Sequence, residues 1–195
     1  MSRRRTLALA AAFAAGALVL AGCTADGDVG EQVANQGYVS GDGSTRQWAV
    51  AERGEPVTLT GTDYAGDPVD TSAWRGDVVV VNTWFAACPP CRVEAPDLAA
   101  IAADRAADGV HLVGINRTDD AGAAQAFEKK FEIPYPTIDD REGTATAALQ
   151  GVAPIAATPT TLVLDRQGRV AARVLGLLDR TTLDALIDDV LAEQA

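Results

Sequence analysis

The chain has 195 residues, with 16 Lys and Arg against 27 Asp and Glu, which gives a formal net charge of −11. Residues 1–22 hold three arginines and no acid, so the remainder is more acidic than the whole. Such a charge repels phosphate backbones and anionic lipid headgroups, which argues against nucleic-acid binding and against adhesion through a basic patch. The length suits one domain with a sizeable core, and three cysteines are too few for a scaffold held by disulfides.

The first 22 residues have the pattern of a bacterial export signal. A basic Ser2–Arg5 stretch precedes an uncharged run from Thr6 to Leu20, which is shorter than the roughly 20 residues of a membrane-spanning helix. The run ends in Leu20-Ala21-Gly22-Cys23, which resembles the lipobox of bacterial lipoproteins. This resemblance implies that Cys23 is lipidated and becomes the new N-terminus; an uncleaved anchor or a chance cysteine is the alternative. The arginine doublet also permits a twin-arginine export route.

Residues 23–45 are rich in Gly, Asp, Ser and Asn, so they cannot bury enough apolar surface to order themselves. We expect them to form a flexible tether between the lipidated cysteine and a folded domain at residues 46–195. Signal peptide, lipid anchor and tether together predict a domain on the outer face of the bacterial cell membrane, where disulfide chemistry is possible.

Hydrophobic patterns predict alternating strands and helices in the folded part. A short hairpin is expected at residues 57–69, because Asp63-Tyr64-Ala65-Gly66 separates two extended pieces. The run Val78–Trp84 is typical of a central strand buried on both faces. The later elements are a helix over 89–107, a strand over 110–116, a helix over 121–131, an extended piece over 133–137, a short helix near 144–150, and strands over 160–164 and 170–177. In a last helix, an apolar stripe runs from Leu183 to Leu191, and Thr181 or Thr182 is the expected cap. This order predicts a three-layer α/β domain.

The motif Cys88-Pro89-Pro90-Cys91 carries the clearest chemistry, because it follows the predicted central strand and begins a helix. A thiolate at a helix N-terminus faces unpaired backbone N–H groups, which lower its pKa below the free value of about 8.5. We therefore expect Cys88 to be the exposed, attacking sulfur and Cys91 the buried, resolving thiol.

Other uses of the cysteine pair fit the sequence less well. A structural disulfide across so short a loop gives little stabilisation. A zinc site is hard to complete because His111 is the one histidine, and attached haem needs histidine at position 92, where Arg92 stands. We therefore expect a dithiol–disulfide couple without a metal or an organic cofactor.

Glu94 and Pro159 are two further candidates for the site. Glu94 lies three residues after Cys91 and four before Leu98, close to the apolar stripe of the helix. It is either a buried proton carrier with a raised pKa or a solvated acid that stabilises the helix dipole. Thr158-Pro159 precedes a strand, where the proline is either cis or part of an ordinary trans turn.

The run from Val80 to Pro96 resembles the TlpA/ResA-like branch of the thioredoxin family, and residues 158–170 resemble its cis-proline loop and following hairpin. The resemblance implies a thioredoxin fold with an N-terminal β-hairpin and an inserted helix-strand segment at about residues 119–150. It also implies roles for the site residues: Cys88 as nucleophile, Cys91 as resolving cysteine, Glu94 as active-site acid, Pro159 as cis-proline beside the sulfurs, and Trp84, Pro89, Pro90 and Thr158 as substrate contacts.

The resemblance implies a membrane-tethered thiol–disulfide oxidoreductase that reduces exported proteins such as apocytochrome c, with electrons from a CcdA/DsbD-like membrane donor. The chain departs from many family members at Phe85-Ala86-Ala87, where a large residue before the first cysteine is missing, so the sequence does not fix the shape of the groove that binds the partner.

One alternative function is that of a Sco-like copper chaperone, which needs a Cys-x-x-x-Cys spacing and a well-placed histidine. The other is a thiol peroxidase, which needs threonine at position 85.

Overall fold

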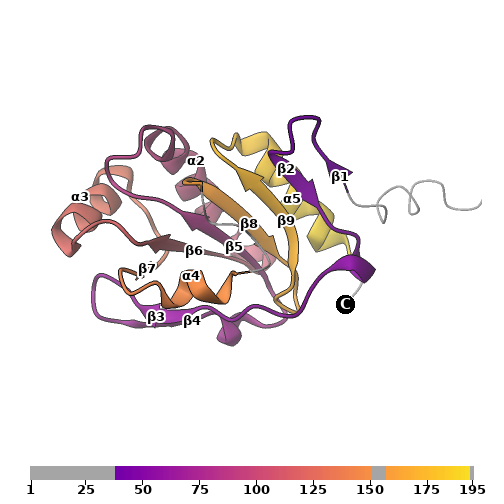
Figure 1. The fold of residues 1–195 in the computed structure, drawn as a ribbon, viewed down its shortest axis with the longest axis horizontal. Helices are drawn as coiled ribbons and strands as arrows, with labels where there is room; N and C mark the ends of the chain where they lie inside the picture. The colour runs from indigo at the N-terminus through magenta and orange to yellow at the C-terminus, as the bar shows by residue number, and fades with distance from the viewer. Residues whose placement is uncertain (1–37, 151–156, 194–195) are drawn as a thin grey trace, which may run out of the picture. The chain divides into compact units, whose positions relative to one another are not determined.

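The computed structural model describes residues 38–150 and 157–193 (Figure 1). The predicted signal peptide, Cys23 and most of the predicted tether lie outside these residues. Seven strands form one mixed sheet in the order β1-β2-β9-β8-β5-β6-β7, and β3 and β4 form a separate hairpin. Within the described ranges, no helix is both long enough and apolar enough to cross a membrane.

The strands are β1 (Tyr38–Val39), β2 (Thr45–Gln47), β3 (Thr60–Thr62), β4 (Pro68–Asp70), β5 (Val78–Thr83), β6 (Val110–Asn116), β7 (Thr137–Asp139), β8 (Thr160–Leu164) and β9 (Val170–Leu175). The α-helices are α2 (Pro89–Arg105), α3 (Ala121–Phe131), α4 (Thr144–Ala148) and α5 (Arg180–Ala192), with short 3-10 helices at Val50–Glu52, Thr71–Trp74 and Ala106–Asp108. The predicted bounds of β6, α3 and β8 are confirmed to the residue.

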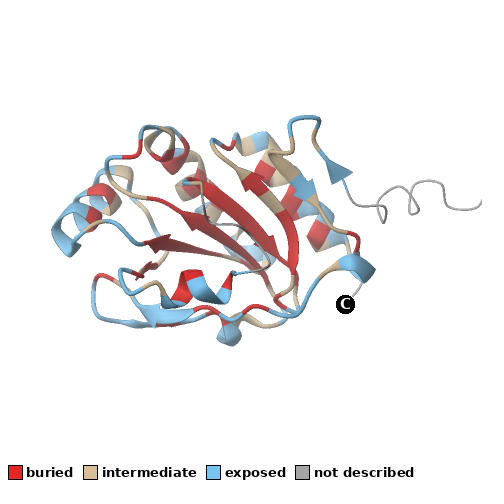
Figure 2. Cartoon of the chain, in the orientation of Figure 1, coloured by how far each residue is buried: buried red, intermediate tan, exposed pale blue. Residues whose placement is uncertain are grey.

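Strand β5 lies in the middle of the sheet, between β8 and β6, and all of its residues are buried. Successive side chains of a strand point to opposite faces of the sheet. Val78 and Val80 therefore pack in one hydrophobic cluster, and Val79 and Val81 pack in another. Figure 2 shows the consequence, a buried central sheet with exposed elements around it. The prediction of a central strand buried on both faces is confirmed.

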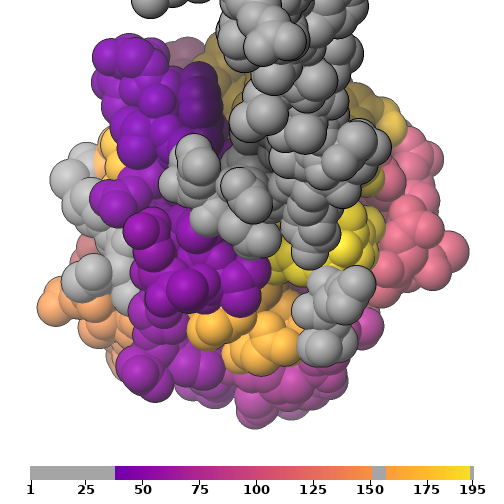
Figure 3. Space-filling view, turned by 90° about the vertical axis from the view of Figure 1, so that its right-hand side faces the viewer, coloured from indigo at the N-terminus to yellow at the C-terminus, as the bar shows by residue number. Residues whose placement is uncertain are grey.

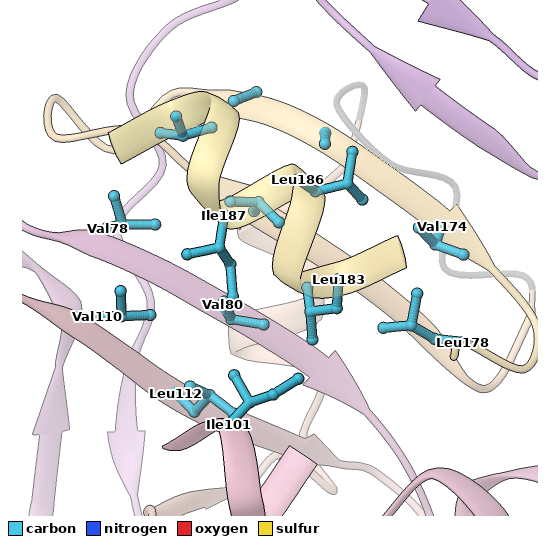
Figure 4. Packing of buried hydrophobic residues seen from close by; sticks show 14 of the residues in the cluster. Val78, Val80, Ile101, Val110, Leu112, Val174, Leu178, Leu183, Leu186 and Ile187 are labelled. Carbon is cyan, nitrogen blue, oxygen red and sulfur yellow. The ribbon is translucent and has the colours of Figure 1, made fainter. Parts of the chain in front are cut away.

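Helices α2 and α5 cover the first of these faces. In Figure 4, Leu183 and Ile187 of α5 lie over Val80 of β5. Ile101 of α2 and Leu112 of β6 belong to the same cluster. Each fully buried aliphatic side chain of this kind contributes about 1.5–3 kcal/mol, so this packing fixes α2, and with it the cysteine motif, against the sheet.

The β3–β4 hairpin and α4 cover the second face. Leu59, before β3, and Leu149, after α4, have no exposed surface and pack in the cluster of Val79. The hairpin strands begin slightly later than predicted. Strand β7 is also later than the expected extended piece, because Pro134 and Pro136 have no backbone N–H to donate to a strand ladder.

Strands β1 and β2 are not predicted by the hydrophobic pattern and lie at the end of the stretch assigned to a tether. The turn between them is closed by the Asp42 carboxylate, which accepts hydrogen bonds from the Ser40 hydroxyl and the Ser44 backbone N–H. Strand β2 then pairs antiparallel with β9. Pairing with the edge of the sheet, rather than burial, orders these polar residues.

Helix α5 is capped by Asp179, so the prediction of Thr181 or Thr182 as its cap is wrong. The Asp179 carboxylate accepts the Thr182 backbone N–H at 3.0 Å and the Thr182 hydroxyl at 2.7 Å. Both threonines lie inside the first turn, because the helix begins at Arg180. An acid at the N-cap also interacts favourably with the helix dipole.

A buried arginine joins the N-terminal segment to the C-terminal part of the domain. The Arg53 side chain is 4% exposed, and its Nη1 lies 3.0 Å from Asp165 Oδ2 and 2.7 Å from Glu193 Oε2. Asp165 follows β8 and is 2% exposed, whereas Glu193 follows α5. Figure 3 shows the indigo N-terminal segment against the orange and yellow C-terminal residues.

We predict that Arg53→Ala lowers the free energy of unfolding by about 3 kcal/mol, because it leaves the buried Asp165 carboxylate without one of its cations. Denaturant unfolding followed by circular dichroism measures this loss. Arg141→Ala removes an exposed partner of Asp139 and serves as the matched control, with almost no loss expected. If both variants lost the same free energy of unfolding, burial of the Arg53–Asp165 pair would add nothing to stability, contrary to this prediction.

Candidate active site

The two cysteines of the motif form a disulfide at the beginning of α2. Their sulfurs are 2.08 Å apart and their Cα atoms 5.3 Å apart. Cys88 is the N-cap residue of the helix, and its Sγ accepts the Cys91 backbone N–H at 3.2 Å. The Cys88 sulfur thus occupies the place of a capping oxygen, where the helix dipole and free N–H groups stabilise negative charge. This position suits a sulfur that alternates between disulfide and thiolate.

Both cysteines are buried in the disulfide form. Cys88 is 2% exposed and Cys91 is 1% exposed, and both pack in a cluster with Tyr64, Trp84 and Phe127. The expectation that Cys88 is exposed is therefore wrong for this state. The bond to Cys91 directs its sulfur toward the helix, and the aromatic side chains of the cluster pack around the pair.

Glu94 is buried beneath the dithiol, one turn after Cys91, with 1% of its surface exposed. Its Oε1 accepts a hydrogen bond from Asn82 Nδ2 at 2.8 Å, and its Oε2 accepts the Leu178 backbone N–H at 3.2 Å. Asn82 Nδ2 also donates to Thr161 Oγ1 at 3.1 Å. Helix α2, strand β5 and the loop before α5 therefore meet at one carboxyl group, and β8 is joined to it through Asn82.

Burial raises the pKa of Glu94 from 4.5 to about 7, because the charged form loses contact with water. The hydrogen bonds from Asn82 and Leu178 act in the opposite direction, since both stabilise the carboxylate. A carboxyl group with a pKa near neutrality can gain and release a proton under physiological conditions. The sequence leaves open whether Glu94 is a buried group with a raised pKa or a solvated acid near the helix dipole, and in the structure it is buried.

Asn82 and Thr161 are site residues that the sequence reasoning missed. Asn82 interrupts an otherwise aliphatic strand, and it is 3% exposed. A polar side chain in a strand buried on both faces needs a hydrogen-bonding partner, because an unpaired buried amide costs free energy. That signal could have pointed to Asn82 as the partner of a second buried polar group. Nothing comparable in the sequence marks the backbone N–H of Leu178.

Pro159 lies at the same edge of the sheet as the dithiol. Thr160, the residue after it, pairs with Thr83 at the end of β5, from which the chain continues to Cys88. The Thr158–Pro159 peptide bond is cis, Pro159 is buried and Thr158 is exposed. Of the two alternatives for this proline, the structure has the cis form.

The other predicted substrate contacts lie around the motif in different environments. Trp84 is 4% exposed, and its ring stacks on Phe127 of α3 with centroids 4.3 Å apart. Pro89 is exposed and Pro90 is partly buried, both in the first turn of α2. Only the two prolines and the exposed Thr158 therefore offer accessible surface, whereas Trp84 supports the cluster from inside.

His111 lies far along the sheet from the cysteines. It pairs with Val79 near the beginning of β5, whereas the dithiol follows the end of that strand. Its Nε2 is 2.9 Å from Asp77 Oδ2, and its ring stacks on Trp74 at 4.9 Å. This placement gives the copper-chaperone alternative no support. In the described part of the chain, no three His, Cys, Asp or Glu side chains are grouped in a way that could hold a metal ion.

We predict that the free energy of unfolding of the oxidised protein falls by up to about 3 kcal/mol as pH rises from about 4.5 to about 7 through Glu94. In this interval the unfolded chain releases the Glu94 proton while the folded protein still holds it, so rising pH favours unfolding. Glu94→Gln removes this contribution, and denaturant unfolding at several pH values measures the difference between the two proteins. Parallel stability curves for wild type and variant would contradict the assignment.

Comparison with curated proteins finds relatives that exchange thiols and disulfides. The thiol:disulfide interchange protein HelX of Rhodobacter capsulatus is 33% identical over 126 residues, which cover 65% of this chain and 68% of HelX. The thiol:disulfide interchange protein DsbE of Pseudomonas aeruginosa is 34% identical over 107 residues, which cover 54% of this chain and 55% of DsbE.

Comparison with solved structures confirms the predicted thioredoxin-like fold. A secreted thiol-disulfide isomerase from Corynebacterium glutamicum superimposes with a TM-score of 0.72 at 31% identity, covering 80% of this chain and 97% of that one. The family model described as Redoxin matches residues 49–188, which include the dithiol, Glu94 and Pro159. The chain therefore belongs to the redoxin family and is a thiol–disulfide oxidoreductase with a thioredoxin-like fold.

Proposed function

We propose that this protein is a membrane-tethered reductant of disulfides in exported proteins, and that the Cys88–Cys91 pair carries the electrons. The observation that supports this most strongly is the position of the disulfide. It caps the active-site helix, one turn before a buried carboxyl group whose pKa lies near neutrality. A disulfide whose function was only to hold the fold together has no use for such a group.

In the proposed reaction, the reduced protein begins with a Cys88 thiolate. This thiolate attacks one sulfur of the substrate disulfide, so that a Cys88–substrate disulfide forms and the other substrate sulfur leaves as a thiolate and takes up a proton. Cys91 then gives its proton to Glu94 and attacks Cys88 Sγ. The internal disulfide forms, and the second substrate sulfur leaves as a thiolate and takes up the proton that Glu94 received from Cys91. The substrate gains two electrons and two protons, and the protein is oxidised to the disulfide form.

The oxidised protein must then be reduced again by a dithiol donor in the membrane. A CcdA/DsbD-like protein fits this requirement, and apocytochrome c is a fitting substrate because its cysteines must be reduced before haem is attached. The named activity of the relatives HelX and DsbE, thiol:disulfide interchange, supports this chemistry. We further propose that lipidated Cys23 and the tether keep the domain close to that donor.

We predict a reduction potential of the Cys88–Cys91 pair near that of thioredoxin, about −270 mV, because the proposed direction is reductive. The full chain is equilibrated with defined dithiothreitol buffers, and its free thiols are counted after alkylation. A potential near −120 mV is typical of disulfide donors and would overturn the direction while preserving the cysteine roles. Cys88→Ser is the control and should abolish the reduction of insulin disulfides, so turnover by this variant would overturn the mechanism itself.

We also predict that the resolving step accelerates as pH rises through about 7, because Glu94 accepts the Cys91 proton only when it is ionised. Glu94→Gln should slow this step by roughly 10²-fold at neutral pH and remove the inflection near pH 7. Rapid acid quenching of the mixed disulfide measures the rate.

Asp97→Asn is the matched control, since Asp97 is an acid on the same helix, three residues further along and partly exposed. It should keep the inflection. Unchanged kinetics in Glu94→Gln would remove Glu94 from the mechanism and leave the cysteine chemistry intact.

A further inference from the structure

The stretch Phe85-Ala86-Ala87 joins the central strand to Cys88, and its middle residue is bonded on both sides by charged side chains. The Ala86 backbone N–H donates to Asp119 Oδ2 at 2.6 Å. The Ala86 carbonyl oxygen accepts from Arg92 Nη1 at 2.9 Å. Asp119 lies between β6 and α3, and Arg92 lies in α2, so two separate segments of the chain form hydrogen bonds with one residue of the loop.

The Asp119 carboxylate is itself held in place. Asn116, which has no exposed surface, donates from Nδ2 to Asp119 Oδ2 at 2.8 Å. Its Oδ1 accepts the backbone N–H groups of Thr118 and Asp119, both at 3.0 Å. Asn116 thus holds the Asp119 carboxylate at the end of β6, where this carboxylate accepts the Ala86 N–H.

Arg92 is held at the other side of the loop. Its guanidinium carbon lies 5.4 Å from the ring centroid of Phe131 of α3, a contact that favours a cation over an aromatic face. Its backbone N–H donates to the Cys88 carbonyl at 3.2 Å, and the Cys88 N–H donates to the Phe85 carbonyl at 3.1 Å. Arg92 is therefore bonded both to the Ala86 carbonyl and to the Cys88 carbonyl, whereas the Cys88 N–H closes a turn with Phe85.

Hydrogen bonds, more than apolar packing, hold the loop around Ala86 in place. Ala86 is half-buried against the cluster of Trp84 and Phe127, but its side chain is only a methyl group and Ala87 is exposed, so apolar burial contributes less here than in the core. A short loop without packing or hydrogen bonds has many conformations, and each of them directs the following residue differently.

We propose that Asp119 and Arg92 are positioning residues, which fix Ala86 and thereby the orientation of Cys88 toward a substrate disulfide. This inference rests on the proposed attack by Cys88. Neither side chain reacts; both act through the backbone of Ala86. Arg92 and Asp119 have opposite charges. If they acted on the Cys88 thiolate only through charge, removing one would raise the attack rate and removing the other would lower it. If they act by positioning, removing either one lowers the attack rate.

The test is a double-mutant cycle on the full chain. Reduced protein reacts with the disulfide of nitrothiobenzoate, and stopped-flow absorbance of the released, coloured thiolate gives the rate constant of the first attack. We expect Asp119→Ala and Arg92→Met each to slow this attack by about tenfold, as loss of orientation does. The double variant should be no more than about twofold slower than either single variant, because residues that act through one shared group are not additive.

Two further variants separate positioning from general damage. Asp119→Asn keeps an oxygen acceptor for the Ala86 N–H without the charge, and should restore the wild-type rate to within about twofold. Asp120→Ala removes the N-cap of α3, which accepts the Ala123 N–H, and leaves Ala86 untouched. It should lose stability and keep the wild-type rate.

The outcomes distinguish this inference from the proposed function. A wild-type rate in Asp119→Ala, additive losses in the double variant, or opposite changes in the two single variants would each overturn the positioning role. A loss in Asp119→Asn as large as in Asp119→Ala would overturn it too, in favour of charge. If Cys88→Ser reacts as fast as the wild type, the proposed attack by Cys88, and not only the positioning role, is overturned.

Discussion

The burial of β5 on both faces dictates how the other elements of the domain are arranged. Because neither face of this strand is in contact with water, the sheet must be covered by α2 and α5 on one side and by α4 and the β3–β4 hairpin on the other. The chain then leaves the buried strand and enters α2 within a few residues. The dithiol consequently follows a fully buried strand, and its sulfurs lie where the helix dipole stabilises a thiolate.

The Glu94 carboxyl group is buried at a cost to stability. A carboxylate in such a place loses its hydration, and two donated hydrogen bonds offset only part of that loss. The group consequently retains its proton up to about neutral pH. The residues that tune it come from β5, from the loop before α5 and, through Asn82, from β8. Proton affinity at the site is thus a property of the assembled fold rather than of the helix that carries Glu94.

Much of the fold follows from local pattern, and the failures have identifiable physical causes. The valine run predicts the central strand, and the spacing of apolar residues predicts α3 and α5, because burial on one or both faces leaves a periodic trace. Strands β1 and β2 leave no such trace, since they are short and not buried; β1 pairs with β2, and β2 pairs with β9. The cap of α5 was assigned to the wrong residue because Asp, Thr and Thr stand together and all can cap.

Features close together in the chain are enough to predict the class of chemistry: two cysteines at the beginning of a helix, an acid one turn later and a proline before a strand. These features depend on residues close together in the chain, where helical geometry and peptide chemistry dictate the outcome. The three-dimensional packing is needed to show that Glu94 is buried, that Asn82 and Leu178 bind it, that Cys88 is shielded in the disulfide form, and that Asp119 and Arg92 meet at Ala86. Each of these depends on contacts between segments far apart in sequence, and hydrophobic periodicity carries no information about which polar groups will face one another across a packed core.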